Sequence, residues 1–155
     1  MSTQIQGTRQ DTFLVNLSVE HPKNLGNFID YGVWDTKTGG EIDSEERLYY
    51  PGGMKPPYSL GGRVNPGQVT LSRNYRLGRD HANVQQLIDA VGRSRVKISQ
   101  QPMDRYKNRY GNPIVWNGTL KTLTLPEHNS ESTSDPGMIE LVVTVDHPPT
   151  STPSK

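Results

Sequence analysis

Apolar side chains recur at every second position through much of this chain. In Thr12–Glu20, the residues Phe13, Val15, Leu17 and Val19 share one face of an extended strand. Six further segments carry strand signals: 28–34, 41–50, 68–75, 95–100, 114–125 and 138–145. A period of two does not gather apolar residues on one side of a helix, so the fold is predicted to be mainly β.

One segment departs from this pattern and is predicted to be the single helix. It spans Asp80–Val91, between an aspartate suited to the N-cap and Gly92, suited to the C-terminal stop. Its apolar residues fall on one face: Val84, Leu87, Ile88 and Val91. Four strands, one amphipathic helix and three strands predict a β-sandwich or small barrel with one flanking helix.

Proline and glycine dominate Pro51–Gly67, which holds four prolines and five glycines in 17 residues. This composition excludes a helix or a central strand and predicts a long Gly/Pro-rich loop. Turn residues in Asp35–Gly40 predict a hairpin between the strands at 28–34 and 41–50. A single domain at 12–147 is expected, and the ends of the chain are expected to be less regular: an N-terminal arm at 1–11 and a disordered tail at 148–155.

Composition limits how this domain is stabilised and what it binds. Hydrophobic residues make up only 31% of the 155 residues, which allows one thin core and leaves contacts with other copies to add stability. The absence of cysteine excludes a disulfide scaffold, and a net charge of +1 does not indicate a nucleic-acid binder. No apolar run suggests a signal peptide or a membrane span, so neither secretion nor a membrane partner is expected.

Charge is divided between two segments. Residues 28–46 carry six acidic residues and one lysine, whereas residues 93–109 carry six basic residues and one aspartate. Opposite patches suit packing between copies, but on charge alone two ordinary solvated faces are the better explanation.

No arrangement of residues indicates catalysis, a cofactor or a metal. The four histidines are scattered: His21, His81, His128 and His147. The glycine pairs at 52–53 and 61–62 precede no helix N-terminus, which a phosphate cradle requires. The protein is therefore predicted not to be an enzyme and to need no cofactor.

Five segments in order carry a resemblance to a known family: LGNFIDYGVWDTKTGGEIDSEERLYYPGGM, SLGGRVNPGQVTLSRNY, the helix Asp80–Val91, GTLKTLTLPEHNSES and MIELVVTVD. Their order and spacing resemble the bacteriophage tail tube protein family, which includes the tubes of contractile injection systems. The resemblance covers residues 12–146. The loop at 51–67 is richer in proline than the family pattern.

The resemblance implies a structural virion protein. Such subunits form hexameric rings that stack into a hollow tail tube, whose strands close into one barrel around the channel. The implied location is the virion tail, assembled in the host cytoplasm, and the implied role is delivery of the phage genome. The implied partners are other copies of the chain, a tape-measure protein and double-stranded DNA in the lumen, tail terminator and baseplate or tip proteins, and sheath subunits if the tail is contractile. The sequence does not distinguish a contractile tail from a non-contractile one.

Acidic residues on the strand 41–50 are candidates for the lumen wall. Alternation places Glu41, Asp43 and Glu45 on one face. The other face holds Ile42, Ser44 and Leu48. If that second face packs on the subunit's own sandwich, the acids face the channel, where a carboxylate wall repels DNA. The alternative is that the strand lies on the outer surface and its acids only solubilise the protein.

Apolar residues are sparse in the loop at 51–67: Met54, Tyr58, Leu60 and Val64. Because the loop offers them nothing to pack against, it is predicted to bridge to a neighbouring subunit and to become ordered on assembly.

A monomeric β-sandwich binding module is the alternative function. Its loop at 51–67 would grip a carbohydrate or a protein, and five aromatic residues would supply platforms: Trp34, Tyr49, Tyr50, Tyr58 and Trp116. Rings and tubes in electron micrographs would favour the tube subunit, and small monodisperse particles the binding module.

Overall fold

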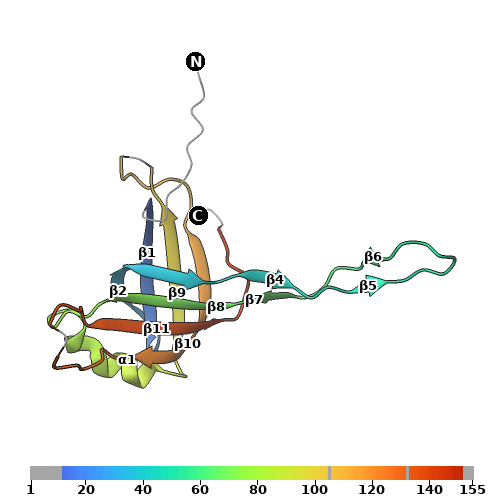
Figure 1. The fold of residues 1–155 in the computed structure, drawn as a ribbon. Helices are drawn as coiled ribbons and strands as arrows, with labels where there is room; N and C mark the ends of the chain where they lie inside the picture. The colour runs from blue at the N-terminus through green and yellow to red at the C-terminus, as the bar shows by residue number, and fades with distance from the viewer. Residues whose placement is uncertain (1–11, 105, 132, 152–155) are drawn as a thin grey trace, which may run out of the picture.

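The computed structural model describes residues 12–104, 106–131 and 133–151. Within them, a seven-stranded antiparallel sheet in the order β2-β1-β9-β10-β11-β8-β3 forms the body (Figure 1). Its strands are β1 (Phe13–His21), β2 (Asn24–Trp34), β3 (Thr36–Gly39), β8 (Gln68–Asn74), β9 (Arg95–Pro102), β10 (Ile114–Thr124) and β11 (Met138–Val145). The prediction of a mainly β fold is confirmed, with one α-helix, α1 (Val84–Ala90), in the described part of the chain.

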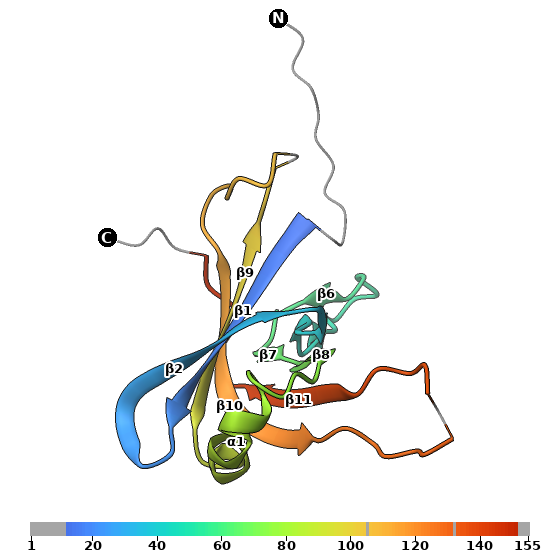
Figure 2. The same cartoon turned by 90° about the vertical axis from the view of Figure 1, so that its left-hand side faces the viewer.

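The sheet curls until its two edges come together. Strands β2 and β3 lie at opposite ends of the strand order, yet only Asp35 separates them in the chain. The chain therefore leaves the sheet at one edge and re-enters it at the other. Figures 1 and 2 show the resulting roll, which is the sandwich-like architecture expected from the sequence.

The core fills the inside of this roll. Val15, Leu17 and Val19 of β1 are buried, as their alternation predicts. The other buried apolar residues are Tyr31, Trp34, Val69, Leu71, Leu87, Ala90, Val96, Ile98, Trp116, Leu120, Ile139, Leu141, Val143 and Val145. Helix α1 contributes its buried residues against β1 and β10, so it closes one end of the roll.

A buried ion pair lies at the seam, by which we mean the place where the edge strand β2 meets β3 and β8. Arg73 on β8 is 1% exposed, and its guanidinium donates to the carboxylate of Asp80 and to the backbone carbonyls of Tyr31 and Val33 on β2. The same guanidinium lies 4.3 Å from the centroid of the Trp34 ring. One side chain thus connects β2, β8 and the segment before the helix.

Asp80 does not cap the helix as the sequence predicted. Its carboxylate accepts hydrogen bonds from Arg79 and from the backbone N–H of Arg76, each at 3.0 Å, and makes none to the helix. Burial alone would raise the pKa of Asp80, but these donors and Arg73 outweigh burial and lower it. A 3-10 turn, η2 (His81–Asn83), precedes α1, so the α-helix is shorter than predicted.

The predicted hairpin between 28–34 and 41–50 is wrong. Most of its expected turn is strand β3, which pairs with β8. Gly39 and Gly40 both have positive φ, +82° and +80°, and a Cβ on Gly39 would lie 2.2 Å from the carbonyl oxygen of Gln68. The two glycines therefore allow a close approach within a continuing ladder rather than a chain reversal.

The segment 41–50 is also not one strand. It contains β4 and β5, which pair with β7 and β6 inside the predicted loop. These short strands are β4 (Ile42–Ser44), β5 (Leu48–Tyr49), β6 (Tyr58–Ser59) and β7 (Val64–Pro66).

The ends of the chain are only partly described. Residues 1–11, predicted as an N-terminal arm, and residues 152–155 lie outside the described residues. In the described part of the expected disordered tail, Thr150 exchanges two backbone hydrogen bonds with Val115 of β10, at 2.8 and 3.0 Å. The disorder predicted for 148–155 stays a prediction.

Candidate assembly interface

Residues 41–67 form a two-stranded arm that projects from the body (Figure 1). The N–H of Gly40 donates to Gln68 at 2.8 Å, and the N–H of Gly67 donates to Glu41 at 2.8 Å. The ladder between β3 and β8 therefore continues directly into the arm. At ~3.3 Å per residue, the arm reaches about 40 Å from the body.

Two residues allow the strands of the arm to approach each other closely. At Gly62, an added Cβ would lie 1.7 Å from the carbonyl oxygen of Glu45, so only glycine fits this approach. Pro66 lies opposite Ile42 in a ladder with no third strand, where a residue without an N–H is tolerated.

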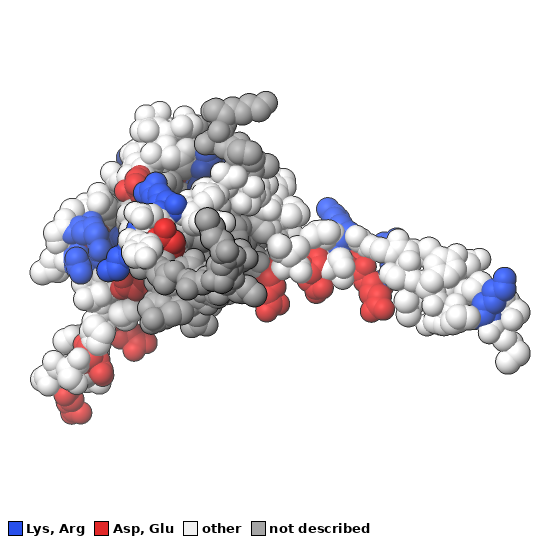
Figure 3. All heavy atoms as spheres, turned by 90° about the horizontal axis from the view of Figure 1, so that it is seen from above, with Lys and Arg blue, Asp and Glu red and all other residues white. Residues whose placement is uncertain are grey.

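The predicted lumen residues alternate along one strand of the arm. Glu41, Asp43 and Glu45 are all exposed, and Asp43 lies opposite Asn65. Figure 3 shows acidic side chains along one side of the part of the arm nearest the body. Glu45 contacts Arg47 at 3.7 Å on the surface. Whether this side of the arm faces a lumen stays a prediction.

The packing expected for the opposite side is wrong. Ile42 is 60% exposed and Leu48 44% exposed. The arm leaves the sheet before these residues and has a single layer of strands, so the subunit's own core does not cover them. Packing of the apolar side on the subunit's own core therefore gives no reason for the acids to face a channel.

The four predicted bridging residues, Met54, Tyr58, Leu60 and Val64, are all exposed, and Met54 is fully so. One of the four, Tyr58, meets an aromatic residue on the other strand of the arm, a pairing that the sequence did not predict. Tyr49 lies opposite Tyr58, with ring centroids 5.3 Å apart. The apolar arm surface, which we define by its exposed residues, comprises Ile42, Leu48, Tyr49, Tyr50, Met54, Tyr58, Leu60 and Val64. Its contact with a neighbouring subunit stays a prediction.

Two of the five aromatic residues considered as binding platforms belong to the core. Trp34 is 3% exposed and Trp116 7% exposed. The ammonium of Lys37 lies 3.9 Å from the centroid of the Trp116 ring, and burial lowers the pKa of Lys37. The three tyrosines of that set all lie on the arm.

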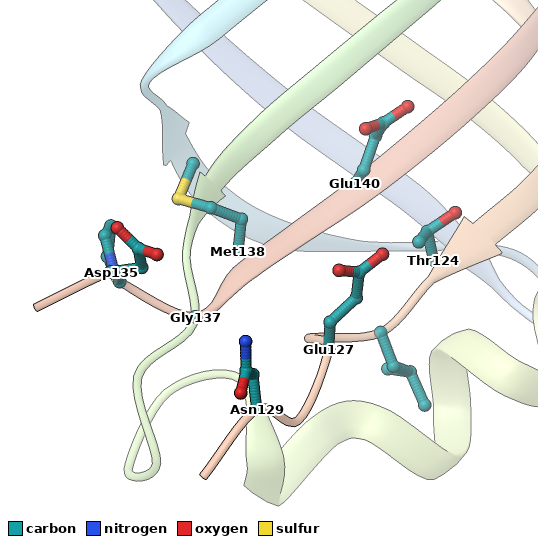
Figure 4. A pocket seen from close by; sticks show the side chains of 9 residues that line it. Thr124, Glu127, Asn129, Asp135, Gly137, Met138 and Glu140 are labelled. Carbon is teal, nitrogen blue, oxygen red and sulfur yellow. The ribbon is translucent and has the colours of Figure 1, made fainter. Parts of the chain in front are cut away.

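A pocket of about 340 Å³ lies between the ends of β10 and β11 (Figure 4), at the end of the body opposite the arm (Figure 1). Its walls come from the ends of β10 and β11 and from the connection between them. The lining residues are Thr124, Leu125, Glu127, Asn129, Asp135, Pro136, Gly137, Met138 and Glu140. The pocket therefore combines three carboxylates with apolar side chains, and no local pattern in the sequence predicts it.

Within the described ranges, no group of three or more His, Asp or Glu side chains is placed to hold a metal ion. The same residues include no helix that is both long and apolar enough to cross a membrane. Two of the histidines make local hydrogen bonds, His81 with the Tyr75 hydroxyl at 2.7 Å and His21 with the Lys23 N–H at 3.1 Å.

Known proteins resemble this chain in structure rather than in sequence. No family model and no curated protein matches the sequence. A chain of the sheath–tube complex of PVC, an extracellular contractile injection system in its extended state, aligns with a TM-score of 0.65 and 16% identity, over 94% of this chain and 93% of that chain. A chain of the PVC sheath/tube terminator gives 0.67 and 14%, over 94% and 96%. The chain has a tail-tube-type fold.

A third match comes from a different assembly. A chain from the six-fold symmetrised baseplate of the anti-feeding prophage aligns with a TM-score of 0.60 and 17% identity, over 95% of each chain. At such identities the likeness establishes the fold, and the tail-tube-type resemblance predicted from the sequence is confirmed at that level.

Proposed function

We propose that this protein is a structural subunit of a phage-type tail tube, in which hexameric rings stack into a hollow conduit for the genome. The observation that carries the proposal is the arm, whose apolar surface the described part of the body leaves exposed. The shared fold supports it, because similar chains come from the sheath–tube complex and the sheath/tube terminator of a contractile injection system and from the baseplate of the anti-feeding prophage. The six-fold symmetrised baseplate supports the choice of hexamers.

Burial of the apolar arm surface is a reason for subunits to associate. Its eight side chains are each at least 44% exposed. Fully burying one large apolar side chain contributes about 1.5–3 kcal/mol, so covering these eight exposed side chains contributes several times that amount. This is the scale needed to offset the loss of translational freedom and the ordering of side chains on association.

In the proposed tube, Glu41, Asp43 and Glu45 face the channel. Six copies per ring would then line the wall with carboxylates. Double-stranded DNA carries one negative charge per ~1.7 Å, so such a wall repels it and offers no site where it would be retained. A tape-measure protein would occupy the same channel before the DNA.

The remaining partners follow from the position of such a ring in a tail. Rings at the ends of the tube would contact terminator and baseplate or tip proteins. The likeness to chains from the sheath–tube complex and the sheath/tube terminator of a contractile injection system supports sheath subunits as a further partner on the outside. The proposed location is the virion tail, after assembly in the host cytoplasm.

Electron microscopy of the purified protein tests the proposal. Rings and tubes are expected from the wild type. Replacing residues 54–64 with a short Gly-Ser linker should leave the body folded and stop tube growth, whereas Leu77→Ser, at an exposed apolar residue of the body, should leave tubes intact. Monodisperse wild-type monomers at high concentration would contradict the proposed function and favour the binding module.

A further inference from the structure

The arm and the β10–β11 pocket lie at opposite ends of the molecule. In the ladder between β8 and β11, Gln68 at the base of the arm pairs with Thr144, whereas Met138 of the pocket pairs with Asn74 at the other end. Figure 1 shows the same separation, with the arm on the right and the β10–β11 connection on the left. The tip of an arm that points away from the body is thus directed away from its own pocket.

The pocket offers negative charge beside apolar surface. Leu125 and Met138 are 42% and 38% exposed, although both are apolar. In Figure 4, Glu127 from the connection and Glu140 from β11 lie on the same side of the pocket as Thr124. Among the described residues, neither Glu127 nor Glu140 has a Lys or Arg in ion-pair contact. The pocket therefore suits a cation carried next to an apolar group.

The tip of the arm carries these two groups side by side. Met54 is fully exposed and holds a positive φ of 60°, which is uncommon for a side chain of its size. Lys55 follows it, is exposed, and forms no ion pair within the described residues. Pro56 and Pro57 come next and fix their own φ angles, which reduces the ordering cost of binding the tip.

We propose that the arm tip of one subunit docks in the β10–β11 pocket of a second copy. Lys55 then lies between Glu127 and Glu140, and Met54 packs against Leu125 and Met138. The volume of about 340 Å³ falls in the range of about 300–1,000 Å³ that is typical of binding pockets. This inference rests on the proposed self-assembly and names the surface that receives the arm.

The contact is heterologous, because two different patches of the chain meet. Each subunit then offers one tip and one pocket, so every added copy creates the site for the next. Such a contact generates a closed ring or an open helical array, depending on whether its rotation closes. Both outcomes suit a tube that is built from rings.

Disulfide trapping tests the contact directly, because the chain has no cysteine of its own. Met54→Cys and Met138→Cys are made as separate proteins, mixed and oxidised. Cross-linked dimers are expected in the mixture and not in either protein alone. Leu77→Cys replaces Met138→Cys in the control, since Leu77 is exposed on the body outside the pocket. Equal cross-linking to both positions, or to neither, would overturn the inference.

Exchanging the charges of Lys55 and Glu127 tests the same contact independently. Lys55→Glu should raise the critical concentration for assembly about tenfold, because an attractive contact becomes repulsive in every added subunit. Adding Glu127→Lys to the same chain should return the critical concentration to within about twofold of the wild-type value. Lys107→Glu changes an exposed lysine elsewhere on the chain. Adding Glu127→Lys to that variant should not lower its critical concentration.

The outcomes separate this inference from the proposed function. Wild-type tubes with unchanged assembly of Lys55→Glu would end the docking assignment and leave the tube subunit intact. Cross-linking between tip and pocket in small oligomers, without rings or tubes, would support the docking and contradict the tube.

Discussion

Removing the negative charge of Asp80 should destabilise the body far more than removing a surface carboxylate. Arg73 and Asp80 have side chains only 1% exposed, so Asp80→Asn leaves a buried guanidinium without its counter-ion. Loss of one member of a buried pair costs about 3–5 kcal/mol. Arg73 keeps its hydrogen bonds to Tyr31 and Val33, so the lower end, about 3 kcal/mol, is expected.

Thermal unfolding followed by circular dichroism measures this cost. A loss of 3 kcal/mol corresponds to a decrease in Tm of about 6–12 °C for a domain of this size. Asp146→Asn is the matched control, because Asp146 pairs with Arg95 at the surface, where the side chains are 32% and 41% exposed. That variant should lose at most about 1 kcal/mol.

A double variant separates the unpaired charge from any other effect of the substitution. Arg73→Met with Asp80→Leu removes both charges and keeps apolar volume in the seam. Much of the lost stability should return, because an apolar replacement needs no counter-ion. Equal Tm values for Asp80→Asn and Asp146→Asn would refute the reasoning that the seam depends on this pair.

Three further predictions concern acid, the arm and the lumen. The pKa of Asp80 is lowered in the fold, so the stability that its pairing contributes is complete above its unfolded pKa of about 3.9. That stability is lost as the pH falls through the lower pKa of the folded state. In an acid titration, Asp80→Asn should therefore lack this pH-dependent loss of stability. Gly62→Val should leave the Tm of the body unchanged and abolish tubes in electron micrographs, since its Cβ has no room beside Glu45; normal tubes would contradict the role given to the arm. Cysteines at Asp43 and Glu45 should react quickly with a bulky maleimide in monomers and slowly in assembled tubes, and equal rates would place these residues on the outer surface.

Alternation predicted the strands of the body well because a core covers one side of each. β1, β9, β10 and β11 all begin and end within a few residues of their predicted bounds. The same rule misled at 41–50, because alternation tells which residues share a side but not what covers that side. Ile42 alternates like a core residue and is nevertheless exposed.

The other errors arise from tertiary contacts that local sequence does not show. Gly39 and Gly40 are typical turn residues, but here they serve a close contact between β3 and β8, which depends on a partner remote in sequence. Asp80 has the ideal position for a cap, yet the guanidinium groups of Arg73 and Arg79 compete for its oxygens. The β10–β11 pocket was missed because its walls meet only after the two strands pair.

The continuity of the arm with β8 determines how the subunit responds to force. A pull on the arm is transmitted along the axis of β8, which lies beside its antiparallel neighbour β11. Seven residue pairs join these two strands, from Met138–Asn74 to Thr144–Gln68, and antiparallel hydrogen bonds run perpendicular to the strands. Tension therefore loads the whole ladder in shear, so its bonds must fail together rather than one after another.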